Sequence, residues 1–186
     1  FNGDDFLGGG SGNDSIYGGD QNDDLLMDAG NDLLDGGAGS DWLVVGGAQP
    51  TRIDLALAGR QSTGHGLDVI RGIEHADGGT GTDTLLGNAQ TNILRGNAGN
   101  DLLAGRAGAD RLDGGFGNDI LDGGVGNDTL LGGGNNDRLV GGLGVDLLSG
   151  GLGADVFVFR GLGDSHAAQS DGIVDFRPGT DRIDLS

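Results

Sequence analysis

Several residue types are rare or missing in this chain of 186 residues, which contains no cysteine, no lysine and only 2 prolines. Without cysteine, no disulfide can hold the fold together. The longest apolar runs, such as Val156–Phe159, are only a few residues long, whereas a membrane-spanning helix needs about 20. Only 8 residues are aromatic, so the hydrophobic core is expected to be thin. No cationic and then apolar segment of the signal-peptide type opens the sequence.

The charge is almost all of one sign. There are 29 acidic residues against 10 basic ones, all of them Arg, which gives a net charge of −19. Nucleic acid and anionic membrane surfaces repel such a chain, so neither is an expected partner. Of the acidic residues 28 are Asp and one, Glu74, is Glu. Asp is preferred over Glu in tight turns and in loops that bind hard cations, so the composition indicates turns and metal binding rather than general solubility.

Glycine is abundant, with 44 residues, which together with the charge would indicate disorder if the glycines had no period. They have a period of nine. Chance would place about two Asp at 14 such positions, so 13 Asp and one Asn establish a repeat. The marker residues of the 14 repeat units are Asp5, Asp14, Asp23, Asp32 and Asp41 in one block, and Asp83, Asn92, Asp101, Asp110, Asp119, Asp128, Asp137, Asp146 and Asp155 in another.

Each repeat unit has the same order of residue types. A large apolar residue stands two places after the marker in all 14 units, and Gly stands two places before it in 11, the exceptions being Gln21, Gln90 and Asn135. Residues 114–122, Gly-Gly-Phe-Gly-Asn-Asp-Ile-Leu-Asp, form one complete unit. Nine residues are too few for a useful helix, but they suffice for a six-residue turn and a three-residue strand whose middle side chain points inward.

Two units would form one coil of 18 residues with a strand on each side. Stacking such coils about 4.8 Å apart places each inward Leu above the Leu of the previous coil. The sequence therefore predicts an all-β fold, a parallel β-roll (β-solenoid) of nonapeptide repeats with stacked aliphatic side chains between two sheets. The marker Asp residues would lie above one another and repel unless a cation lies between them. Six or more oxygen ligands from carboxylates and carbonyls suit Ca²⁺ better than Mg²⁺.

The unit resembles Gly-Gly-x-Gly-x-Asp-x-U-x, where U is a large apolar residue, the calcium-binding nonapeptide of RTX (repeats-in-toxin, haemolysin-type) proteins. The resemblance covers residues 1–159 apart from one interruption, and it implies that each Ca²⁺ lies between two turns on the same side of the roll. Units two apart form up to 10 pairs, hence up to about 10 Ca²⁺ sites. Sites that involve Asn92, Gln21 or Gln90 should be weaker, above all the pair of Asn92 and Asp110. The implied metal ligands are Asp5, Asp14, Asp23, Asp32, Asp41, Asp83, Asp101, Asp110, Asp119, Asp128, Asp137, Asp146 and Asp155.

Residues 45–77 do not follow the period, so they are expected to break or bulge the roll. Ile53, Leu55 and Leu57 alternate with smaller or polar residues, and residues 67–75 form a second strand-like run. Similar segments occur between the repeat blocks of RTX proteins. We therefore expect an inserted strand segment here.

Four side chains near this segment invite a functional interpretation. His65, Glu74 and His75 have the chemistry of a metal or acid–base set, but their spacing fits no compact motif such as His-Glu-x-x-His, so ordinary surface strands are favoured. Trp42 should point outward. Packing of its ring against the inserted segment is favoured over stacking on a sugar.

The end of the chain differs from the repeats. Phe157 and Phe159 are expected to point inward from a longer alternating strand. Residues 161–186 resemble the C-terminal cap of serralysin-type proteases, family I.3 lipases and alginate epimerase R-modules, through 172–176 and 179–186. A roll needs a cap because its last coil otherwise leaves strand edges unpaired. The expected divisions are repeat block 1 (1–44), an inserted segment (45–77), repeat block 2 (78–159) and a truncated cap (160–186).

No catalytic residue is expected in these 186 residues. Gly163-Asp164-Ser165-His166 is not the Gly-x-Ser-x-Gly elbow of a hydrolase, and the extended zinc-protease motif His-Glu-x-x-His-x-x-Gly-x-x-His is absent. Without Ca²⁺, one buried aliphatic side chain per unit does not offset about 1–2 kcal/mol of backbone ordering per residue. The chain should therefore be disordered until it meets Ca²⁺ at extracellular concentrations, about 10⁻⁴ to 10⁻³ M.

The resemblance implies a bacterial protein that the type I secretion apparatus exports unfolded and that folds outside the cell. The sequence thus predicts a non-catalytic, extracellular calcium-binding module that supports secretion and stability, with contact to a cell surface or polysaccharide as a further option. In the alternative, the chain is the C-terminal portion of a secreted enzyme, a serralysin-type metalloprotease, family I.3 lipase or alginate C5-epimerase, whose catalytic domain lies upstream. Phe1 stands at the second position of a unit, so a fragment of a longer protein is expected. An ice-binding or carbohydrate-binding face ranks lower because the outward strand positions are mixed, as Ser15, Trp42 and Arg111 illustrate.

Overall fold

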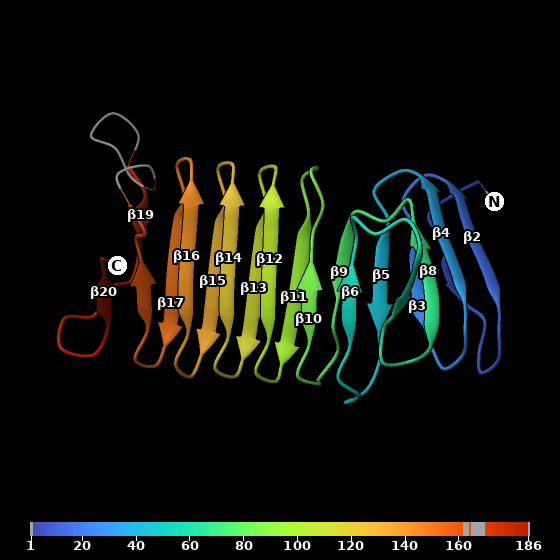
Figure 1. The fold of residues 1–186 in the computed structure, drawn as a ribbon, viewed down its shortest axis with the longest axis horizontal. Coiled ribbons are helices and arrows are strands. Elements are labelled where there is room, and N and C mark those ends of the chain that lie inside the picture. Colours follow the sequence, from blue (N-terminus) through green and yellow to red (C-terminus); the bar gives the residue numbers. More distant parts are fainter. Residues whose placement is uncertain (1, 162–163, 165–169, 186) are drawn as a thin grey trace.

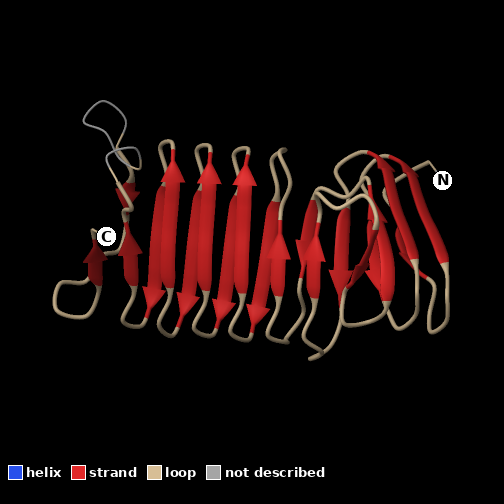
Figure 2. Ribbon diagram, in the orientation of Figure 1, coloured by secondary structure: helices blue, strands red, loops and turns tan. Residues whose placement is uncertain are grey.

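The structure is a computed structural model that describes residues 2–161, 164 and 170–185. Throughout this part of the chain the regular structure is β-strand, arranged in three sheets (Figures 1 and 2). The nine-stranded sheet runs in the order β1 (Phe6–Gly8), β3 (Asp24–Met27), β5 (Trp42–Val45), β9 (His75–Asp77), β11 (Ile93–Ala98), β13 (Arg111–Phe116), β15 (Thr129–Gly134), β17 (Leu147–Leu152) and β19 (Gly172–Ile173). The seven-stranded sheet runs in the order β20 (Arg182–Asp184), β18 (Val156–Val158), β16 (Arg138–Leu143), β14 (Ile120–Val125), β12 (Leu102–Ala107), β10 (Thr84–Leu86) and β6 (Arg52–Asp54). The four-stranded sheet runs in the order β2 (Ser15–Asp20), β4 (Leu33–Ala38), β8 (Leu67–Arg71) and β7 (Arg60–Ser62).

The chain winds as a roll, because successive strands alternate between the two sides. In repeat block 2, each strand pairs in parallel with the strand 18 residues away, so that Leu103 lies beside Leu121 and Leu112 beside Leu130. The two termini lie at opposite ends of the roll (Figure 1). The predicted all-β parallel β-roll is confirmed. No helix among the described residues is long and apolar enough to cross a membrane.

The division of each repeat unit into strand and turn differs from the expectation. Strands β11 to β17 have six residues each rather than three. The second and third residues of the expected turn also pair between coils, as Asn97 with Gly115 and Ala98 with Phe116, while the register skips Gly96 and Gly114. Because the coils superpose, the backbone of this glycine-rich segment can still join the ladder. The prediction of a six-residue turn was wrong, and the turn proper has three residues.

The core is the expected ladder of single inward side chains between the two sides. Each side chain packs against those of the neighbouring coils, and full burial of one Leu contributes about 1.5–3 kcal/mol. Phe157 is buried and Phe159 is partly buried against the same cluster, which confirms their inward orientation, although β18 has only three residues. Residues with no exposed surface include Leu25, Leu34, Leu43, Ile53, Leu85, Leu94, Leu103, Leu112, Leu121, Leu130, Leu139, Leu148 and Phe157.

The inserted segment is built into the roll and interrupts it on one side only. On the nine-stranded side β9 continues the sheet, since His75 pairs with both Trp42 and Ile93. On the other side the sheets are separate, with β8 beside β4 and β6 beside β10. The strand-like run 67–75 is divided by a turn at Gly72, where φ is 56°, so that β8 and β9 lie in different sheets. Strand β7 runs antiparallel to β8.

The end of the chain covers the last coil, as expected of a cap. Strand β19 pairs with β17, and β20 pairs with β18. Both strand edges of the final coil are therefore hydrogen-bonded. Of the segment Gly163-Asp164-Ser165-His166, only Asp164 lies within the described residues.

Candidate metal centres

The marker residues form two ladders, one along each edge of the roll where the chain turns. Within a ladder the backbone N of one marker donates to Oδ1 of the marker one coil later, as Asp101 to Asp119 at 2.9 Å and Asp110 to Asp128 at 2.8 Å. The first edge holds Asp5, Asp23, Asp41, Asn92, Asp110, Asp128 and Asp146. The second edge holds Asp14, Asp32, Asp83, Asp101, Asp119, Asp137 and Asp155.

The second carboxylate oxygen of most marker residues is buried and makes no hydrogen bond. Removing a charged carboxylate oxygen from water without a partner costs several kcal/mol of free energy. A bound cation or a proton on each of these atoms would compensate for that cost. Of the thirteen marker Asp residues, eleven have such an Oδ2 atom: Asp5, Asp14, Asp23, Asp41, Asp83, Asp101, Asp110, Asp119, Asp128, Asp137 and Asp146.

The first glycine of the unit leaves room beside these oxygens. A methyl group added to Gly114 would lie 2.5 Å from Oδ2 of Asp119 and 2.7 Å from the carbonyl O of Gly132 in the next coil. The same two kinds of oxygen flank Gly123, close to Asp128 and Gly141. In the described part of the chain no three Asp, Glu or His side chains converge, so a metal ion at this position would need backbone carbonyls as ligands. A mixed set of carboxylate and carbonyl oxygens fits Ca²⁺.

Burial changes the protonation of the ladders. It raises the pKa of Asp83, Asp119, Asp128 and Asp146 to about 6, and that of Asp137 to about 7. Repulsion by the markers of neighbouring coils adds to the effect of burial on each pKa, while the hydrogen bond from the adjacent backbone N opposes it. Without a compensating cation, these carboxyl groups hold protons close to neutral pH.

The inserted segment and the cap extend both ladders with residues that the sequence analysis did not assign to them. Asp68 accepts from the N of Asp32, and Glu74 from the N of Asp41. In the inserted segment, Thr51 N also donates to Asp83. In the cap, Asp171 and Asp181 accept from the backbone N of the markers Asp146 and Asp155. A signal was present, because an apolar residue follows each of them two places later, as it follows the markers: Ile53, Ile70, Ala76, Ile173 and Ile183.

A third set of residues, immediately before the markers, was missed altogether. Oδ1 of Asn100 accepts from the N of Asn118 at 2.8 Å, and Oδ1 of Asn118 accepts from the N of Asn136 at 3.0 Å. Asn136 in turn accepts from Ala154 at 2.7 Å. These amides link the turns of successive coils without a metal. The recurrence of Asn before the marker could have predicted them.

The Asn92 position differs from the other markers. Its Nδ2 donates to the carbonyl O of Glu74 at 2.8 Å, and its Oδ1 accepts from the N of Asn88 at 2.8 Å. The amide is thus satisfied within the protein. A weak site at Asn92 stays a prediction, and this arrangement supports it. The departures from Gly at Gln21 and Asn135 adopt left-handed φ values of 79° and 78°.

His65, His75 and Trp42, the side chains considered for other chemistry, do not form one site, because His65 contacts other residues than His75 and Trp42 do. His75 Nδ1 accepts from the N of Ile93 at 3.0 Å and its Nε2 lies 2.7 Å from Ser40 Oγ, while burial lowers its pKa. His65 Nε2 lies 3.1 Å from Thr51 Oγ1. The Trp42 ring packs 4.9 Å from the ring of His75, with the guanidinium of Arg95 4.3 Å from its centre. The expectation that Trp42 packs against the inserted segment is confirmed.

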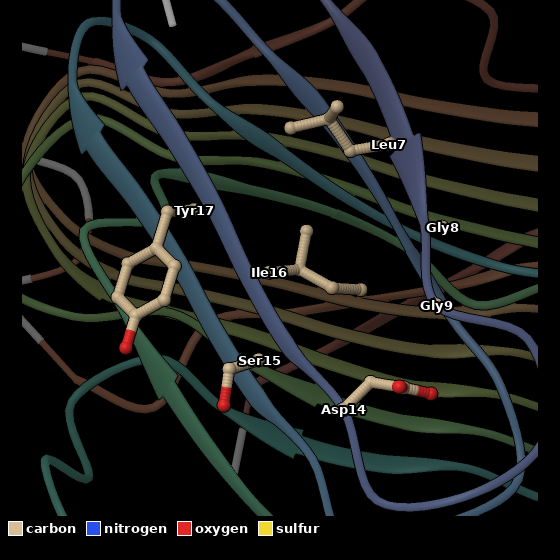
Figure 3. A pocket seen from close by; sticks show the side chains of 7 residues that line it. All are labelled: Leu7, Gly8, Gly9, Asp14, Ser15, Ile16 and Tyr17. Carbon is tan, nitrogen blue, oxygen red and sulfur yellow. The ribbon is translucent and has the colours of Figure 1, made fainter.

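A cavity of about 250 Å³ opens at the first coil between β1 and β2 (Figure 3). Leu7 and Ile16 point into it, whereas Tyr17 points to the other face of β2. The titratable side chains of its lining are Asp14, which is half-buried, and Tyr17, which is 53% exposed. The cavity is the open end of the hydrophobic core and does not bring reactive groups together.

Comparison with known proteins agrees with the geometry of the ladders. The family model for the RTX calcium-binding nonapeptide repeat matches residues 1–34, 28–48, 68–103, 77–112, 95–130 and 131–161. Among solved structures, the extracellular lipase LipA from Serratia marcescens matches with 20% identity and a TM-score of 0.21. The match covers 94% of this chain and 38% of the lipase chain. No curated protein sequence matches. A repeat β-roll of this kind is a structural calcium-binding domain and not a catalytic one. The chain belongs to the family of RTX calcium-binding nonapeptide repeat proteins.

Proposed function

We propose that the marker Asp residues hold Ca²⁺ along both edges of the roll, with up to about 10 ions in all. The observation that carries this proposal is the row of eleven buried Oδ2 atoms without a hydrogen bond. All of them except that of Asp5 lie beside a glycine where an added methyl group would collide with the carboxylate. Bound calcium supplies the positive charge that such oxygens need. Ten ions would change the net charge from −19 to about +1. The proposed ligands are Asp5, Asp14, Asp23, Asp32, Asp41, Asp83, Asp101, Asp110, Asp119, Asp128, Asp137, Asp146 and Asp155.

Calcium binding and folding are coupled in this proposal. Each unit buries one large side chain, and the same unit stacks one carboxylate on the next. The ladders therefore oppose the roll until their charge is balanced. Calcium modules of the extracellular type bind at about 10⁻⁴ to 10⁻³ M, far above the calcium level of the cytosol, so the chain would pass a type I secretion apparatus unfolded and fold outside. The folded roll would then stabilise the protein that carries it.

We propose that the chain divides after residues 44, 77 and 159. The inserted segment then serves to join the two repeat blocks, since β9 pairs with β5 of block 1 and β11 of block 2. The cap closes block 2 through β19 and β20.

Circular dichroism tests the coupling directly. The chain is stripped with a chelator and titrated with Ca²⁺ or with Mg²⁺. We expect a β-rich spectrum to appear with millimolar Ca²⁺ and not with the same concentration of Mg²⁺. A β-rich spectrum that persists in excess chelator at neutral pH overturns the proposal.

A pair of matched variants assigns the effect to the ladders. Asp119→Asn removes one charge from the second edge, where the side chain is 1% exposed. Asp113→Asn removes the same charge from the outer face of β13, where Asp113 pairs with Arg111 at 3.5 Å. We expect Asp119→Asn to raise the calcium midpoint of folding. Asp113→Asn should not raise it, because Asp113 lies outside the ladder and its charge only adds to the repulsion at Asp119. Equal midpoints for the two variants would contradict a role of the marker Asp.

Limited proteolysis tests the extracellular part of the proposal. The chain should be digested rapidly at a cytosolic calcium level of about 10⁻⁷ M and resist digestion at about 10⁻³ M. Resistance at both concentrations would remove the reason for folding outside the cell.

A further inference from the structure

On the second edge the marker Asp155 meets an arginine of the cap, a contact that no other marker makes within the described residues. Nη2 of Arg177 lies 2.6 Å from the carbonyl O of Gly153, 3.3 Å from Oδ2 of Asp155 and 3.4 Å from Oδ1 of Asp181. The backbone N of Arg177 also donates to Oδ2 of Asp181 at 2.7 Å. Both carboxylates are almost fully buried, with side-chain exposures of 0% and 1%. One cationic side chain thus faces two buried carboxylates and a turn carbonyl.

Because of this contact, the hydrogen bonding of Asp155 differs from that of Asp137, the marker one coil earlier. Oδ2 of Asp137 is buried without a hydrogen bond, whereas Oδ2 of Asp155 accepts from Arg177. Among the ion pairs between described residues, only the two made by Arg177 involve a marker or another carboxylate that continues a ladder. Other arginines pair with carboxylates on the outer faces or, in the case of Arg106, with Asp54 of the inserted segment.

The oxygens that surround the Arg177 guanidinium are of the kind that Ca²⁺ takes elsewhere in the ladders, a carbonyl and two carboxylates. Calcium lies about 2.3–2.6 Å from its oxygen ligands. A cation bound to these three oxygens would therefore collide with Nη2, which already lies within 3.4 Å of all of them. Guanidinium and Ca²⁺ are thus mutually exclusive at this position.

We propose that the guanidinium of Arg177 takes the place of a calcium ion between Asp155 and Asp181, so that the second edge ends in a position that binds no calcium. The inference rests on the proposed calcium sites of the other markers. The Arg177 guanidinium thus holds the cap against the last coil by an ion pair with Asp155, in addition to the hydrogen bonds that join successive coils. An internal cation, carried by the chain itself, balances Asp155, the marker of repeat block 2 that the cap covers on that edge.

Counting bound calcium tests the proposal, by native mass spectrometry of the 186-residue chain in saturating Ca²⁺. Asp181→Asn removes the outer carboxylate of the Arg177 position, and Asp137→Asn removes a marker carboxylate one coil earlier. We expect Asp181→Asn to bind as many ions as the wild type and Asp137→Asn to bind at least one fewer. One ion fewer in Asp181→Asn overturns the proposal, because that position would then hold calcium in the wild type.

The reverse change is expected to create a site. Arg177→Gln removes the internal cation and should bind one ion more than the wild type. Arg182→Gln is the matched control in the same cap, since the ion pair of its guanidinium among the described residues is with Asp184, at 3.9 Å, away from the ladder carboxylates, and it should leave the count unchanged. An unchanged count in a folded Arg177→Gln chain also overturns the proposal, and if this variant does not fold, the Asp181→Asn count decides alone. Failure of the proposed function itself would be visible separately, as an unchanged count in Asp137→Asn.

Discussion

Lowering the pH from 7 to 5 should weaken calcium-driven folding by an amount that follows from the buried carboxyl groups. The pKa of Asp137 is raised to about 7 and that of Asp119 to about 6, in both cases mainly by burial. A proton must leave the carboxyl group before it can bind a cation. At a pKa of about 7, this competition lowers calcium affinity about 50-fold between pH 7 and pH 5, or about 2.3 kcal/mol. At a pKa of about 6, the loss is about 10-fold, or about 1.4 kcal/mol.

The calcium-free chain should respond to pH in the opposite direction. Because the pKa in the folded state lies above the ordinary value of 3.8, the folded state binds more protons than the unfolded one. The resulting stabilisation is fully present below about pH 4 and is lost as the pH rises through 6 to 7. Acid therefore favours the roll without calcium and opposes calcium binding to it.

The assay is a calcium titration at pH 7 and at pH 5 and constant ionic strength, followed by circular dichroism. The midpoint should rise at least 10-fold at pH 5, and a parallel scan without calcium should show more β-structure at pH 4 than at pH 7. The calcium midpoint of Asp137→Asn should depend less on pH than that of the wild type, because the substitution removes the carboxyl group whose pKa is raised to about 7. A calcium midpoint that is equal at the two pH values would refute the reasoning.

Three substitutions test the packing around the ladders, each by urea unfolding in saturating calcium. Gly114→Ala should destabilise the roll by about 1–3 kcal/mol because its methyl group meets Asp119 Oδ2 and the carbonyl O of Gly132. The control Gly46→Ala, with nothing within 4 Å, should have no effect. Equal stabilities of the two variants would contradict the close packing of Gly114 against these oxygens. Leu121→Ala, at 0% exposure, should cost about 2–5 kcal/mol and its neighbour Ile120→Ala, at 45% exposure, less than about 1 kcal/mol; the reverse order would show that the inward register is wrong. Arg106→Ala should cost about 1 kcal/mol at low salt and less at high salt, since it removes the two-point contact with Asp54 at 2.7 and 2.8 Å; a salt-independent loss would indicate that the charge pair is not the cause.

The repeat positions could be predicted from the sequence because each has one dominant physical role. The inward Leu121 and the marker Asp119 recur at fixed distances in the chain, and coils of constant length convert these distances into stacking. The six-residue strands could not be predicted in the same way. Gly114 and Gly115 have the composition of a turn, and only the superposition of the next coil shows that the ladder continues past Gly114 to Gly115.

Residues of the inserted segment escaped prediction where the spacing leaves the period. Glu74 continues the ladder of Asp41 at a distance of 33 residues, and Thr51 that of Asp83 at 32, neither of which is a multiple of nine. Arg177 was not predictable at all from period or spacing. Its contact with Asp155 depends on how the cap folds back on the last coil, and one Arg among 10 carries no mark of that role.

The one-sided interruption of the roll has a mechanical consequence. The nine-stranded sheet passes from block 1 through β9 to block 2 without a break, while β8 and β6 on the opposite side belong to separate sheets. Bending that opens the divided side breaks only a few contacts between the described residues around β6 and β7, among them the hydrogen bond from Arg52 N to the carbonyl O of Thr63 and those of Gln61 with the backbone of Asp54. Bending the other way must stretch the ladders that hold β9 between β5 and β11. A change in the angle between the two repeat blocks therefore costs the fewest hydrogen bonds at the inserted segment, in the direction that opens the divided side.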